Sequence, residues 1–114
     1  MAAVVEAYLD AIQSHDWTRL ADCVTDDIVR VGPYGDTYTG RDDYIGYISK
    51  LMPTLPGYGM DVKRVTITGG DAFVELSETV EVAGLPTVTN EVLVLRLDGD
   101  RIARIEIFIQ RSPG

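Results

Sequence analysis

Apolar residues in the first half of the chain recur with the period of an α-helix. Between residues 2 and 14 they return at three- and four-residue spacing, which places them on one face of a helix. Asp16 is a favourable N-cap for a short second helix, which we expect to end at residues 26–27. A third helix is predicted to start near residues 40–43, where acidic side chains suit the helix dipole, and to stop at Pro53.

The remainder of the chain is rich in β-branched residues and alternates with a two-residue period. Strands are predicted at 28–31 and 37–39, around a turn at 32–36, and then at about 61–68, 71–82, 87–97 and 101–110. Helices followed by a run of antiparallel strands are typical of the α+β class. With 114 residues and no linker, residues 1–114 are expected to form one domain.

One carboxylate lies within an apolar row. On the strand 71–82, Glu78 shares its face with Val74, Leu76, Val80 and Val82. Burying a carboxylate is unfavourable by several kcal/mol unless the group is paired, hydrogen-bonded or protonated. Glu78 is therefore either a functional group or a strand-end residue that reaches solvent or pairs with an arginine.

A second acid, Glu91, is a candidate neighbour of Glu78. If Glu91 also faces inward, the hairpin sets it opposite or diagonal to Glu78. Two close carboxyl groups in an apolar cavity raise the pKa of one of them, which produces a general acid or base. Arg30 either points to the same interior, where it neutralises Glu78 or an anionic ligand, or lies on the surface.

Tyrosine is the main aromatic residue, with six Tyr against two Phe and one Trp. Tyr8 and either Tyr44 or Tyr47 lie on the helix faces that we expect to cover the sheet. A tyrosine hydroxyl in a cavity wall can donate a hydrogen bond to a substrate oxygen. The alternative is core packing, with the hydroxyl at the rim.

The strand 87–97 is apolar on both faces, which indicates that a second subunit covers its outer face. The loop after it decides which residues of the last strand lie beside it. A three-residue loop with Gly99 at positive φ keeps Leu93 and Leu95 beside the row of Ala103 and Ile105. We therefore predict a three-residue loop.

Charge and cysteine content exclude several classes of protein. There are 10 Lys and Arg against 18 Asp and Glu, so the formal net charge is −8 and the pI is near 4.4. This charge disfavours binding to nucleic acid or to anionic membranes. One Cys and one His cannot form a closed zinc site of the common types, and no phosphate-binding loop occurs in the sequence. We expect no metal, no cofactor and a cytoplasmic location.

Six short motifs occur in a characteristic order along the chain. They are Tyr8-Leu9-Asp10-Ala11-Ile12, His15-Asp16-Trp17, Asp26-Asp27-Ile28-Val29, Gly32-Pro33, Gly40-Arg41-Asp42 and the closing Leu97-Asp98-Gly99-Asp100-Arg101-Ile102. This order resembles the nuclear transport factor two-like superfamily, within it the SnoaL-like polyketide cyclase and ketosteroid isomerase branch, over essentially the whole chain. The resemblance implies a curved antiparallel sheet wrapped around three helices, a deep apolar pocket in this cone, and a homodimer formed through the outer sheet face.

The resemblance carries over only part of a known active site. Tyr8 matches the oxyanion-hole tyrosine of ketosteroid isomerases. Gly32 stands at the position of their general-base aspartate, and Leu93 stands near that of their second aspartate. Ile105 and Ile107 stand where the polyketide cyclases place a histidine and an acid. Members include isomerases, cyclases, dehydratases, epoxide hydrolases and silent binding domains, so the fold does not decide the activity.

These observations predict a cofactor-free acid–base enzyme that acts on a small, mostly apolar carbonyl, polyketide or epoxide compound. Glu78, Glu91 and Tyr8 are the expected catalytic residues. The residues expected to contact the substrate are Arg30, Tyr34, Tyr44, Ile48, Leu93 and Ile107. A non-catalytic small-molecule-binding or dimerisation module of the same fold is the alternative, and a protein-interaction module is a third reading.

Overall fold

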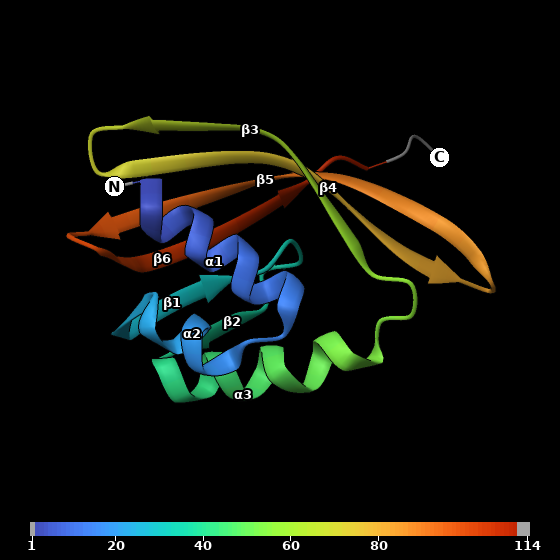
Figure 1. Ribbon diagram of the computed structural model, residues 1–114, viewed down its shortest axis with the longest axis horizontal. Helices are drawn as coiled ribbons and strands as arrows, with labels where there is room; N and C mark the ends of the chain where they lie inside the picture. Colours follow the sequence, from blue (N-terminus) through green and yellow to red (C-terminus); the bar gives the residue numbers. More distant parts are fainter. Residues whose placement is uncertain (1, 112–114) are drawn as a thin grey trace.

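The computed structural model describes residues 2–111, which form three α-helices, one 3₁₀ turn and six strands (Figure 1). In chain order these are α1 (Ala2–Ser14), α2 (Trp17–Asp22), β1 (Val24–Val31), β2 (Thr37–Thr39), α3 (Arg41–Leu51), the 3₁₀ turn η1 (Met52–Thr54), β3 (Gly59–Thr68), β4 (Asp71–Val82), β5 (Leu85–Asp98) and β6 (Arg101–Ile109). The predicted α+β class is confirmed. None of the described helices has the length and apolar character needed to cross a membrane.

The six strands form one curved sheet in the order β2-β1-β6-β5-β4-β3. The three helices lie on one side of this sheet, and the tip of the β4–β5 hairpin extends beyond them (Figure 1). Neighbouring strands are antiparallel except β1 and β6, which are parallel. The expectation of a wholly antiparallel sheet is wrong at this pair, because no hairpin joins β1 to β6 and a long crossover permits a parallel pairing.

The helix boundaries follow the capping signals. α1 has the predicted bounds, and Asp16 caps α2 by accepting a hydrogen bond from the backbone N of Arg19 at 3.1 Å. The expected end of the second helix at residues 26–27 is wrong. α2 ends at Asp22, and the acidic pair lies exposed in β1. The β-branched residues directly after the helix favour a strand and outweigh the helix-ending signal of the acidic pair.

In the β5–β6 hairpin the apolar row of β5 lies beside the apolar row of β6, as predicted, but a bulge and not a three-residue loop sets this register. Gly99 has a positive φ of 60°, as predicted, but the turn contains two residues, Gly99 and Asp100, and not three. A two-residue turn alone places the apolar row of β5 beside the polar row of β6. A bulge at Ala103 corrects the register, so that Leu95 pairs with Ile105.

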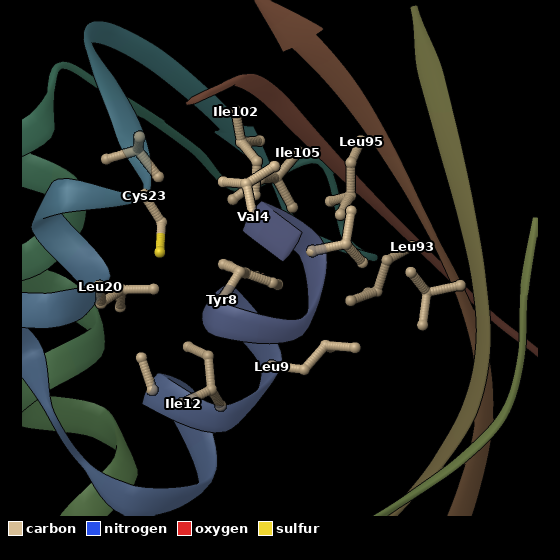
Figure 2. Packing of buried hydrophobic residues seen from close by; sticks show 14 of the residues in the cluster. Val4, Tyr8, Leu9, Ile12, Leu20, Cys23, Leu93, Leu95, Ile102 and Ile105 are labelled. Atoms are coloured by element: carbon tan, nitrogen blue, oxygen red, sulfur yellow. The ribbon is translucent and has the colours of Figure 1, made fainter. Parts of the chain in front are cut away.

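The hydrophobic core lies between α1 and the inner face of the sheet. In Figure 2, Val4 and Leu9 of α1 lie between α2 and the strands that carry Leu93, Leu95 and Ile105. Both Leu95 and Ile105 are fully buried. This packing fixes α1, and with it Tyr8, against the middle of the sheet.

The inner row of β4 follows the predicted alternation only as far as the helices cover it. Val74 and Leu76 are buried, and Glu78 and Val80 are half-buried. Val82 is 58% exposed, because the hairpin tip extends beyond the helices (Figure 1). Glu78 therefore lies where the apolar core meets the open end of the sheet.

Candidate active site

A cavity of about 130 Å³ lies between the helices and the inner face of the sheet. Its walls are formed by Tyr8, Ile12, Arg30, Tyr44, Ile48, Leu51, Met52, Leu55, Tyr58, Met60, Glu78, Val80, Glu91, Leu93 and Ile107. Nine of these side chains are aliphatic or methionine, and the other six are three tyrosines, two glutamates and one arginine. The cavity is therefore mostly apolar but contains several groups that can donate or accept protons.

Glu78 and Glu91 lie next to each other in this cavity, on neighbouring strands. Glu91 pairs with Leu76 and Glu78 pairs with Thr89, so the two glutamates occupy diagonal positions across the hairpin. Both side chains line the cavity, and a hydrogen bond joins their carboxyl groups. The inward direction that the sequence left open for both acids is therefore settled.

The acid pair holds a proton at neutral pH. Burial raises the pKa of Glu91 to about 9, and the hydrogen bond to Glu78 and the charge of Glu78 contribute to the rise. The positive charge of Arg30 opposes it. Glu91 is thus the protonated member, and Glu78 accepts its hydrogen bond. Such a pair offers a proton donor and a proton acceptor side by side.

Tyr58 supplies a second hydrogen bond to Glu78. Its hydroxyl donates to Oε2 of Glu78, and burial together with the glutamate's charge raises the pKa of Tyr58, so the hydroxyl stays protonated. The predicted strand begins at residue 61 and so leaves this tyrosine in a loop, whereas β3 begins at Gly59. The signal that could have found it is its alternation with Met60, which pairs with Glu78.

A backbone hydrogen bond holds the loop before Tyr58 against β4. Gly57 has a φ of 65°, in the left-handed region that favours glycine. The backbone N of Glu81 donates to the carbonyl O of Pro56 at 2.8 Å. These two features direct the chain so that Tyr58 enters the cavity.

Tyr8 and Tyr44 form the helix side of the cavity and are both buried. Burial raises the pKa of Tyr8 to about 12, although the neighbouring hydroxyl of Tyr44 and the charge of Arg30 partly offset the rise. Burial also raises the pKa of Tyr44 well above its ordinary value. Both hydroxyls therefore remain neutral, and Tyr8 can donate to an oxygen atom of a bound molecule.

Arg30 points into the cavity, as one of the two alternatives predicted, and its side chain is 8% exposed. Its Nη1 donates to Oδ2 of Asp36 at 2.8 Å, and its guanidinium carbon lies 5.0 Å from the ring centroid of Tyr47. Among the described residues its ion-pair partner is therefore Asp36 and not Glu78. An aspartate in a turn gives no sequence signal of this kind, because turns contain aspartate for local reasons.

Eight of the nine predicted site residues line the cavity: Tyr8, Arg30, Tyr44, Ile48, Glu78, Glu91, Leu93 and Ile107. The ninth, Tyr34, does not line this cavity, and its contact with a substrate stays a prediction. Tyr34 belongs to the turn between β1 and β2, and it is 72% exposed. Its ring centroid lies 5.6 Å from the guanidinium carbon of Arg111. The tight turn directs this side chain away from the sheet.

A second, wider hollow of about 450 Å³ lies between α1, α2 and the β5–β6 turn. Its walls include Ala3, Val4 and Cys23, which carries the one thiol of the chain. Burial raises the pKa of the Cys23 thiol, which makes it a poor nucleophile at neutral pH. Figure 2 shows Cys23 packed near Leu20, in the role of a small apolar residue. The groups suited to chemistry are therefore those of the smaller cavity.

Solved structures share this architecture. A protein from M. tuberculosis, an LEH-like epoxide hydrolase, is 19% identical, with a TM-score of 0.82 over 95% of this chain and 80% of that chain. A protein from Shewanella denitrificans regarded as a SnoaL-like polyketide cyclase is 14% identical, with a TM-score of 0.84 over 96% and 89% of the two chains. A protein of ketosteroid isomerase-like fold from Catenulispora acidiphila, bound to trimethylamine, is 18% identical, with a TM-score of 0.82 over 92% and 83%.

These likenesses establish the fold, since identities at this level do not carry an activity with them. No curated protein matches the sequence. The family model of the SnoaL-like domain matches residues 5–105, which is most of the chain. The protein therefore belongs to the SnoaL-like domain family.

Proposed function

We propose that this protein is an acid–base enzyme that converts a small, mostly apolar molecule with a carbonyl or epoxide oxygen, without a cofactor. One observation carries the proposal: Glu78 and Glu91 lie side by side in a mostly apolar cavity, where burial raises the pKa of Glu91. A neutral acid beside a carboxylate is the arrangement that general acid–base catalysis requires at neutral pH. The family supports the class of reaction, since epoxide hydrolases and polyketide cyclases occur among proteins of this fold.

Each polar group of the cavity has a role in this proposal. With a ketone, Glu78 removes a proton from the carbon beside the carbonyl, and Tyr8 donates a hydrogen bond to the oxygen as negative charge develops there. Glu91 then returns a proton to the substrate, and the proton taken by Glu78 restores the pair. With an epoxide, Glu91 protonates the ring oxygen as the ring opens, and Glu78 takes a proton from the attacking water.

The size of the cavity narrows the substrate class. In another protein an apolar cavity of about 150 Å³ holds benzene, so a cavity of about 130 Å³ suits roughly six or seven non-hydrogen atoms. Drug-sized ligands occupy about 300–1,000 Å³. A single-ring or short-chain compound therefore fits, whereas a four-ring steroid or a multi-ring polyketide does not.

A small-molecule-binding module without catalysis is the second candidate. The relative from Catenulispora acidiphila binds trimethylamine, a molecule small enough for the cavity of this chain. The cavity pairs a carboxylate with tyrosine rings, and both attract cations. In this reading the acid pair gives up its shared proton when a small amine binds.

Two small compounds distinguish these candidates. With cyclohexanone in D₂O, the enzyme is expected to accelerate exchange of the protons beside the carbonyl, and with cyclohexene oxide it is expected to form the diol; NMR detects both products. A four-ring steroid ketone is expected neither to bind nor to exchange, because the cavity is too small. Binding of the small compounds with full recovery of unchanged material would favour the binding module. Conversion of the steroid alone would contradict the size argument.

We also propose a homodimer through the outer face of the sheet. Phe108 is 56% exposed on this face, and Val92 and Val94 of β5 lie beside it, half-buried. An apolar cluster of this kind on a sheet face is typical of an interface. Phe108→Glu is expected to shift the protein from dimer to monomer in sedimentation velocity. Leu85→Glu, a matched change at the exposed tip of the β4–β5 hairpin, is expected to leave the dimer intact. A monomeric unmodified protein would refute the proposal.

A further inference from the structure

Gly32, at the start of the β1–β2 turn, lies beside the Arg30–Asp36 ion pair. A Cβ atom on residue 32 would lie 2.3 and 2.5 Å from the two carboxylate oxygens of Asp36 and 2.6 Å from Nη1 of Arg30. Such distances are too short for non-bonded atoms. The φ of Gly32 is not in the left-handed region. A side chain at residue 32 would therefore displace the ends of Arg30 and Asp36, because their ion pair occupies the space that its Cβ would need.

The turn holds Asp36 over β1. The backbone N of Gly32 donates to the carbonyl O of Asp36 at 2.8 Å, and the N of Gly35 donates to the O of Gly32 at 3.0 Å. One carboxylate oxygen of Asp36 accepts from Arg30 at 2.8 Å. The other, Oδ1, is buried and accepts no hydrogen bond from the part of the chain that the structure describes. Arg30 is thus the group that holds this carboxylate in place.

Arg30 is the one basic side chain among the described residues that line the cavity, and it is 8% exposed. Water therefore screens its charge only weakly. The charge of Arg30 acts on Glu91 of β5, Tyr8 of α1 and Tyr44 of α3, while Glu78 of β4 and Tyr58 from the loop before β3 also face Glu91. If Arg30 lost its ion pair with Asp36, the carboxyl groups that remain in the cavity to interact with it would be those of Glu78 and Glu91.

We propose that Asp36 is a positioning residue that holds Arg30 against the cavity wall, and that this anchoring leaves the two glutamates free to share a proton. Gly32 belongs to the same arrangement, because a side chain at this position would displace the ion pair from its place. The inference rests on the proposed function for its consequence: Asp36 keeps Glu91 in the proton-donating form. The effect of Asp36 on the pKa of Glu91 is expected whether the protein is an enzyme or a binding module.

Asp36→Asn tests this role by removing the charge while keeping the shape. The pKa of each glutamate is followed by ¹³C NMR of the side-chain carboxyl groups. The pKa of Glu91 is expected to fall from about 9 by about 1–3 pH units, because an arginine no longer neutralised by Asp36 stabilises the ionised carboxylate. Gly32→Ala displaces the same pair without changing any charge and is expected to shift this pKa in the same direction. Asp10→Asn, which removes an exposed carboxylate from α1, is expected to leave it unchanged.

An unchanged or raised Glu91 pKa in both Asp36→Asn and Gly32→Ala would overturn the proposal. If Asp36→Asn does not fold, the double variant Arg30→Met, Asp36→Asn removes both charges. Its Glu91 pKa is expected to equal or exceed that of the unmodified protein, and a fall would overturn the proposal. The titration needs no substrate. Absence of turnover would therefore refute the proposed function alone, and an unshifted pKa would refute only the role of Asp36.

Discussion

Replacing Glu78 by glutamine is expected to lower proton exchange or turnover of a small substrate by about 100- to 10,000-fold. Glutamine keeps the shape of the side chain and can still accept the hydrogen bond of Tyr58, but it cannot take a proton from a substrate. The same change removes the negative charge of Glu78, which raises the pKa of Glu91. The pKa of Glu91 is therefore expected to fall below about 9, although burial still holds it above its ordinary value.

The matched control for this variant is Glu75→Gln. Glu75 lies on the same strand with its side chain on the outer face, where it forms an exposed ion pair with Arg64. The control therefore loses one carboxylate from β4 without touching the cavity, and it is expected to keep full activity. Exchange that survives Glu78→Gln and is equal to that of the control would remove Glu78 from the mechanism. Loss of activity in both variants would indicate damage to the strand.

The acid pair could be predicted from the sequence because it breaks a local pattern. Glu78 interrupts an apolar row, and the short β4–β5 turn brings Glu91 to a diagonal position. Tyr58 and Asp36 break no pattern, since a tyrosine before a strand and an aspartate in a turn are common for local reasons. Their roles come from contacts with side chains on other strands or across a turn. Such contacts depend on register and loop path, which a periodic pattern does not encode.

The same distinction between local patterns and distant contacts applies to the fold. Helices and hairpins were predictable, because the period of the apolar residues and the turn residues specify them locally. The parallel pairing of β1 with β6 joins segments far apart in the chain, and no local signal distinguishes it from an antiparallel pairing. The bulge at Ala103 reconciles a two-residue turn with a buried apolar row. It follows from the packing of the core and not from the sequence of the turn.

Replacing Glu91 by glutamine is expected to stabilise the protein at neutral and alkaline pH while removing its proton donor. A glutamate in the unfolded chain ionises near pH 4.5, whereas folded Glu91 keeps its proton up to about pH 9. Between these values the folded state binds more protons than the unfolded state, so the free energy of unfolding falls as pH rises. The stability that neutral Glu91 contributes is fully present below pH 4.5 and is lost as pH rises through about 9.

Glutamine stays neutral at every pH, and its amide can donate to Glu78 in place of the carboxyl proton. Urea unfolding at pH 5, 7 and 9 is expected to show equal stability at the lowest pH and a gain of about 1–2 kcal/mol for Glu91→Gln at the highest. The gain is smaller than the full pKa shift implies, because Glu91 is only half-buried.

Glu81→Gln, on the exposed end of β4, is expected to follow the unmodified protein. Curves for Glu91→Gln that stay parallel to those of the unmodified protein would show that Glu91 holds no excess proton. A gain in stability with full activity would show that Glu91 is not the proton donor. A gain with loss of exchange would show that Glu91 serves proton transfer and lowers the stability of the protein.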